Sequence, residues 1–147
     1  MKLETWVSIA ALGLSAMFVV LLISFYNFLI GPDGKGPQEV VDTNGVLGEL
    51  ISISGLPAIV LAGICIGLAK TYGSRSSGII LTLAGVLGIA GMLFALNLVS
   101  RISTAFFVGT VVVLPYVFIA AATGILGIGI YLFARGMKRV KNLDDLR

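Results

Sequence analysis

Apolar residues gather into four long stretches that carry no acidic or basic side chain. The stretches are Thr5 to Pro32, Leu50 to Ala69, Ser76 to Ser100 and Ile102 to Ala134. About 20 helical residues, at roughly 1.5 Å each, cross a hydrocarbon core of about 30 Å. We therefore predict an all-α fold, an integral membrane four-helix bundle that forms one polytopic domain over residues 1–147. The predicted spans are about 5–30, 51–70, 77–100 and 111–134, with an outer loop at 31–50.

Two prolines fall in the first turns of predicted spans. Pro57 predicts a local kink or a late start of the second span, because proline lacks an N–H and clashes with the preceding turn. The last stretch, at 33 residues, is longer than one crossing needs. Gly109 and Pro115 are the candidates to break it, which leaves 103–108 along the outer interface.

Basic residues lie mostly on one predicted side of the membrane, formed by the N-terminus, the loop at 70–75 and the C-terminal tail. Eight lie there and two on the other side. Because basic loops stay inside, both termini are predicted to be cytoplasmic in a multi-pass protein of the cell membrane. The tail cluster should bind lipid headgroups; it comprises Arg135, Lys138, Arg139 and Lys141. The aromatic ring of Tyr26 is expected near the outer interface.

Glycines at helical spacing predict close contacts between helices, because small residues let helix backbones approach in lipid. The predicted packing residues are Gly63, Gly67, Gly85, Gly88, Gly91, Gly124 and Gly127. The segments 85–95 and 124–134 are identical at seven of eleven positions. This likeness fits either an inverted repeat, as found in transporters, or the biased composition of membrane helices.

Candidate chemistry is sparse. The chain has no histidine and one cysteine, Cys65, so the usual ligands of haem, copper, zinc and iron–sulfur clusters are missing, and we expect no cofactor and no metal. No nucleophile and base can be paired, so an enzyme is not expected. The net charge of +3 resides mainly in the tail beside the membrane, which argues against nucleic-acid binding. The candidates for a polar pathway or a partner contact are Asn27, Asn97 and Glu49.

Two functional hypotheses follow. The first is a non-catalytic small integral-membrane subunit that packs with and stabilises a larger membrane protein complex, with lipid and other integral-membrane subunits as partners. The second is a homo-oligomeric channel or transporter for a small neutral or apolar solute, with the third and fourth spans forming its pathway.

Overall fold

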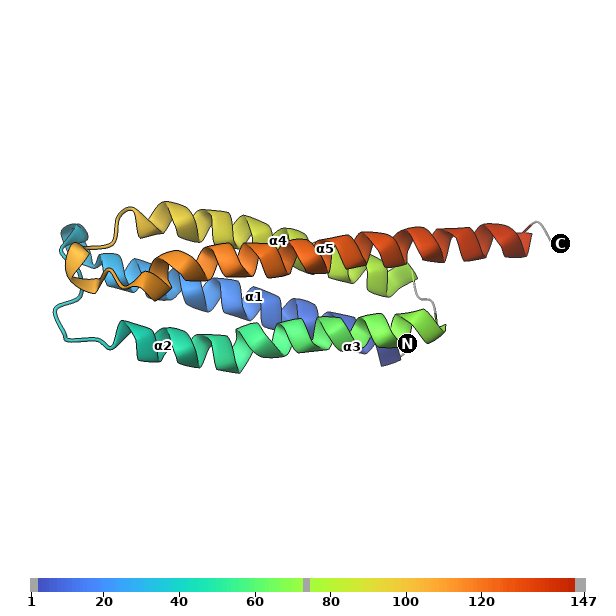
Figure 1. Ribbon diagram of the computed structural model, residues 1–147, viewed down its shortest axis with the longest axis horizontal. Helices are drawn as coiled ribbons and strands as arrows, with labels where there is room; N and C mark the ends of the chain where they lie inside the picture. The colour runs from blue at the N-terminus through green and yellow to red at the C-terminus, as the bar shows by residue number, and fades with distance from the viewer. Residues whose placement is uncertain (1–2, 73–74, 145–147) are drawn as a thin grey trace.

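The computed structural model describes residues 3–72 and 75–144, without the side chains of 70–72 and 138–144, and within these ranges it is all helical, with no strand. Four of its helical segments are long and apolar enough to cross a membrane, which fits a multi-pass membrane protein. They are Leu3–Ile30, Thr43–Ala69, Arg75–Val99 and Gly109–Met137. Both chain ends lie at one end of the bundle, here called the terminal end (Figure 1). The opposite end, here called the loop end, holds residues 31–42 and 100–108.

The second apolar segment begins earlier than its sequence predicts. It consists of α2 (Thr43–Leu50), a π-helical turn η2 (Ile51–Gly55) and α3 (Leu56–Tyr72), in unbroken succession. Helix α2 forms because Leu47 buries fully against the bundle and Val46 donates its N–H to the Asp42 carbonyl at 3.1 Å. The predicted outer loop at 31–50 is therefore shorter, and it ends before Thr43.

The π-helical turn lies directly before Pro57. Leu56 donates its N–H to the Ile51 carbonyl, five residues back, in place of the usual four. Pro57 cannot donate, and its ring would press on the carbonyl of Ile53 in a regular helix. The wider turn relieves this conflict without ending the helix. The predicted disturbance at Pro57 thus takes the form of a π-helical turn.

The last helix is continuous. A short 3₁₀ turn, η3 (Thr104–Phe106), precedes α5 (Gly109–Asp144), which runs well beyond the predicted end of the span at Ala134. Pro115 lies inside α5 and removes one N–H from its ladder. The hydroxyl of Tyr26 in α1 (Leu3–Ile30) donates to the Val111 carbonyl at 2.7 Å. The ring of Tyr26 is thus fully buried in the bundle and not at the lipid interface.

The helices pack unequally. Helix α4 (Arg75–Val99) packs along α5 and along α1, whereas α3 packs mainly on α1 (Figure 1). Bulky side chains fill the core towards the loop end, among them Phe18, Leu22, Tyr26, Leu29 and Met92. Smaller ones dominate towards the terminal end, among them Ala11, Ala62, Cys65, Ala69 and Ala84. The two clusters meet at mid-bundle, where the packing leaves a cavity.

Candidate functional site

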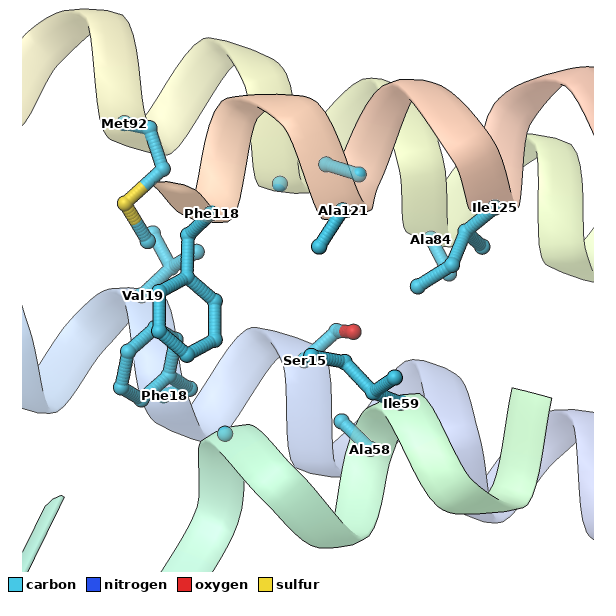
Figure 2. Close-up of a pocket in the computed structure, with 13 residues that line it drawn as sticks. Ser15, Phe18, Val19, Ala58, Ile59, Ala84, Met92, Phe118, Ala121 and Ile125 are labelled. Carbon is cyan, nitrogen blue, oxygen red and sulfur yellow. The ribbon is translucent and has the colours of Figure 1, made fainter. Parts of the chain in front are cut away.

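A partly enclosed cavity of about 30 Å³ lies at the centre of the bundle and receives residues from all four long helical segments. Figure 2 shows Phe18, Phe118 and Met92 at one side of it and Ile59 and Ile125 towards the other. The rings of Phe18 and Phe118 are 4.3 Å apart between centroids. Small residues form the remaining wall: Gly55, Ala58, Ala84, Gly88, Ala121 and Ala122. The cavity exists because so many short side chains meet at one depth.

The π-helical turn helps to build this wall. A β-carbon placed at Gly55 would lie 2.9 Å from Cζ of Phe118 and 3.1 Å from Cε2 of Phe18. Glycine at this position lets the turn approach both rings. The π-helical turn before Pro57 therefore packs against the phenylalanine pair at one boundary of the cavity.

Ser15 supplies the only polar side chain among the residues that line the cavity. Its oxygen points into the open space between the helices (Figure 2). It makes no hydrogen bond to any residue of 3–72 or 75–144. The cavity is thus apolar, with one hydroxyl group in its wall.

The predicted packing glycines fall into two groups. Gly85, Gly88 and Gly91 on α4 face other helices. A β-carbon at Gly85 would lie 2.7 Å from Cα of Leu126, one at Gly88 would lie 2.9 Å from Cβ of Ala122, and one at Gly91 would collide with Val19. These three glycines lie at contacts between helices of this chain.

The other four predicted glycines face outward. Gly63 and Gly67 on α3, and Gly124 and Gly127 on α5, are exposed, and a β-carbon at each would meet nothing within 4 Å. Their predicted packing role would therefore concern contacts with another chain. The two similar segments also differ in environment, because Gly85 is buried while its counterpart Gly124 is exposed.

Helices α4 and α5 form an antiparallel hairpin, and two glycines on the α5 side of their contact were not predicted from the sequence. A β-carbon at Gly129 would lie 2.5 Å from the backbone nitrogen of Thr82, and one at Gly136 would lie 3.2 Å from Cα of Arg75. On α4, a β-carbon placed at Gly78 would lie 2.6 Å from the backbone nitrogen of Phe133. The seven-residue spacings 78/85 and 129/136 could have indicated these packing positions from the sequence, since residues seven apart share a helix face.

The three polar candidates all lie towards the loop end and are exposed. Asn97 donates its side-chain N–H to the Leu93 carbonyl of its own helix at 3.1 Å. Asn27 and Glu39 border a shallow surface groove with Phe28, and Glu49 lies on α2. No hydrogen bond within the described residues joins Asn27, Asn97 and Glu49, and none of them lines the central cavity.

The predicted headgroup-binding residues lie at the C-terminal end of α5, and all but Arg135 follow its last contact with α4, at Gly136. Arg135 is exposed. The side chains of Lys138, Arg139 and Lys141 lie outside the described residues, although their backbone belongs to α5. The cluster thus lies on a helical extension at the terminal end (Figure 1).

A buried polar cluster that the sequence reasoning missed joins α1 to α3. Ser8 donates its hydroxyl to the Glu4 carbonyl at 2.6 Å and lies 3.0 Å from the Cys65 sulfur. Glu4 is only 2% exposed, and its Oε1 accepts no hydrogen bond from the part of the chain that the structure describes. Within residues 3–72 and 75–144, no three His, Cys, Asp or Glu side chains gather as metal ligands would. The cluster contributes polar contacts at the terminal end of the helix pair.

Comparisons with known proteins find no match among protein-family models, curated proteins or solved structures.

Proposed function

We propose that this chain is a non-catalytic subunit of the cell membrane, with both termini cytoplasmic, that packs with and stabilises a larger membrane protein complex. The observation that carries the proposal is the outward glycine pair on α5, Gly124 and Gly127, each with open space where a side chain would be. A smooth face of this kind allows the backbone of a neighbouring helix to approach.

The outward faces of α4 and α5 differ in a way that supports docking on α5. Helix α4 exposes bulky side chains, among them Leu83, Val86, Leu93 and Phe94. Helix α5 exposes bulky side chains towards its ends, among them Tyr116, Val117, Ile130 and Tyr131. Between these two pairs its exposed residues are all small: Ala120, Thr123, Gly124 and Gly127. Since burial in lipid does not drive helices together, van der Waals contact over such small residues is the main source of association. We therefore assign the partner-facing surface to α5.

The test is a pair of matched substitutions, Gly127→Leu and Gly13→Leu. Gly13 on α1 is also exposed with nothing within 4 Å of its β-carbon position, so both variants add the same bulk to an open surface. The chain would be purified from its native membrane in mild detergent, and the co-purifying subunits would be quantified by mass spectrometry. We expect Gly127→Leu to lose these subunits and Gly13→Leu to retain them.

Equal retention by the two variants would contradict an α5 docking face. Recovery of the wild-type chain with no other protein in fixed ratio would contradict the subunit proposal itself. Thermal unfolding of both purified variants controls for damage to the fold, because neither substitution touches the interior of the bundle.

A homo-oligomeric channel or transporter for a small neutral or apolar solute is the second candidate. The central cavity favours it, although this cavity lies among all four long helical segments and not between α4 and α5 alone. Purified protein in liposomes should then accelerate solute entry over empty vesicles. Equal entry rates across a panel of small alcohols, amides and dissolved gases would eliminate it.

A further inference from the structure

A tight turn at the loop end folds the chain back beside the last turn of α1. The Gly36 N–H donates to the Ile30 carbonyl at 2.9 Å, and Gly31 and Gly36 both have positive φ angles, of 65° and 85°. A β-carbon at Gly31 would collide with the carbonyl oxygen of Gly36, so the turn requires glycine there. Residues 37–39 thereby return to the end of α1, and an open groove of about 600 Å³ lies between the two.

The groove lies where an apolar span gives way to a polar loop. Phe28 lines it from the last turn of α1 and is 50% exposed, and Asn27 beside it is exposed as well. A span that ends in an exposed aromatic ring and an amide suits the level at which hydrocarbon meets lipid headgroups. The volume of the groove is within the roughly 300–1,000 Å³ of small-molecule sites. A lipid headgroup is therefore the ligand for which both the position and the size are suitable.

The charge of the groove selects among headgroups. Glu39 is the one charged side chain in its wall, and residues 31–49 contain four acidic residues against one basic residue, Lys35. Within the described residues the Glu39 carboxylate makes no ion pair and the Asn27 side-chain amide makes no hydrogen bond. An anionic headgroup would be repelled by this surface, whereas a headgroup that ends in a cation would be attracted.

The polar groups of the wall favour a primary ammonium over a quaternary one. Proteins recognise quaternary ammonium groups with cages of several aromatic rings, and this groove offers one ring, that of Phe28. A primary ammonium carries N–H donors, which a quaternary one lacks. The Glu39 carboxylate and the side-chain oxygen of Gln38 are acceptors for these donors, and the Asn27 amide supplies an N–H for the lipid phosphate.

We propose that the groove binds the headgroup of a phospholipid that ends in a primary ammonium, of the ethanolamine type. The ammonium donates to the Glu39 carboxylate, the Asn27 amide donates to the phosphate, and the acyl chains run along the exposed side of α1 past Phe28. This binding does not depend on the subunit proposal, since the groove is built by α1 and residues 31–39 while the docking face lies on α5.

Side-chain amide resonances allow a direct test in the full chain. The protein, labelled with ¹⁵N at asparagine, would be studied in phosphatidylglycerol nanodiscs that contain increasing fractions of phosphatidylethanolamine. We expect the Asn27 resonance to shift along a saturating curve. Asn97 is the internal control, because it is also exposed at the loop end but does not line the groove. An Asn27 shift that merely follows Asn97, or that phosphatidylcholine produces equally well, would overturn the proposal.

Glu39 and Glu49 give a matched pair of variants. Both are exposed carboxylates at the loop end, and of the two only Glu39 lines the groove. Glu39→Gln should weaken phosphatidylethanolamine binding about two- to fivefold, as expected for an exposed ion pair, whereas Glu49→Gln should leave it unchanged. Equal binding by the wild type and both variants would overturn the recognition of an ammonium.

Two further measurements separate the lipid from other cations. Soluble O-phosphoethanolamine carries the same headgroup without acyl chains, and in phosphatidylglycerol nanodiscs it should not shift Asn27 along a saturating curve. A saturating shift would assign the groove to a soluble amine and overturn the lipid proposal. Loss of a co-purifying subunit in Glu39→Gln, with lipid binding unchanged, would assign the groove to a basic partner chain and would overturn it as well.

Discussion

The hydroxyl of Tyr26 occupies the place at the Val111 carbonyl that the missing N–H of Pro115 leaves open. In a regular helix Val111 would accept from residue 115, which is proline and cannot donate. Tyr26 donates instead, from another helix, at 2.7 Å. A defect within one helix thereby becomes a bond between two helices, near the loop end of the bundle.

Tyr26→Phe should lower the free energy of unfolding by about 1–2 kcal/mol, because it leaves the buried Val111 carbonyl without a partner. Denaturation in detergent measures the change in the free energy of unfolding, with the loss of helix followed by far-ultraviolet circular dichroism. Tyr116→Phe is the matched control, since the Tyr116 side chain is 59% exposed.

A double mutant checks the mechanism of this prediction. Pro115→Ala restores the N–H, so Tyr26→Phe should cost less stability in the Pro115→Ala background than in the wild type. Additive effects of the two substitutions would show that the hydroxyl does not compensate for the proline.

Gly129→Ala and Gly127→Ala should change stability in opposite directions. In both variants the higher helix propensity of alanine should add up to about 1 kcal/mol to the free energy of unfolding. At Gly129 the added methyl would lie 2.5 Å from the Thr82 backbone nitrogen, so α4 and α5 must separate, at a cost of about 1–3 kcal/mol. At Gly127 the methyl meets open space. Thermal unfolding of the two variants measures both changes. A Gly129→Ala variant more stable than the wild type would disprove the close contact.

Glu4→Gln should raise the free energy of unfolding by about 1–3 kcal/mol at neutral pH. Glu4 is buried, and one oxygen of its carboxyl group accepts no hydrogen bond from any described residue. The neutral amide has nearly the same volume and avoids the cost of burying a charge. Glu49→Gln, at an exposed position on α2, should have no measurable effect. Loss of stability in Glu4→Gln would instead indicate that the carboxylate pairs with a cation.

The proposed orientation predicts that residues 31–42 face the outside of the cell. Val40→Cys in a Cys65→Ser background should react in intact cells with a maleimide that cannot cross the membrane, because Val40 is fully exposed. Met137→Cys, at the terminal end, should react only after the cells are opened. The reverse pattern would place the termini outside.

The sequence predicted the four apolar helices well, because the absence of charge over 20 or more residues is a strong signal in itself. It could not decide which glycines meet other helices, since the rotation of each helix depends on its neighbours. Gly124 and Gly127 look equivalent to Gly85 and Gly88 in sequence, yet they face outward while Gly129 and Gly136 face α4. The early start at Thr43 was hidden by Glu49, which lies on the exposed side of α2 and interrupts the apolar stretch without ending the helix.

The unequal packing of α3 has a consequence for how the chain is made. Synthesis runs from the N-terminus, so α1 and α3 both exist before α4 and α5 are made. The contact between Ser8 and Cys65 can form at that stage, whereas the contacts of Val19 with Gly91 and of Tyr26 with Val111 must wait for later segments. A ribosome-bound intermediate that ends after α3 would thus already hold its first helix pair, and the later hairpin of α4 and α5 would complete the bundle against the open side of α1.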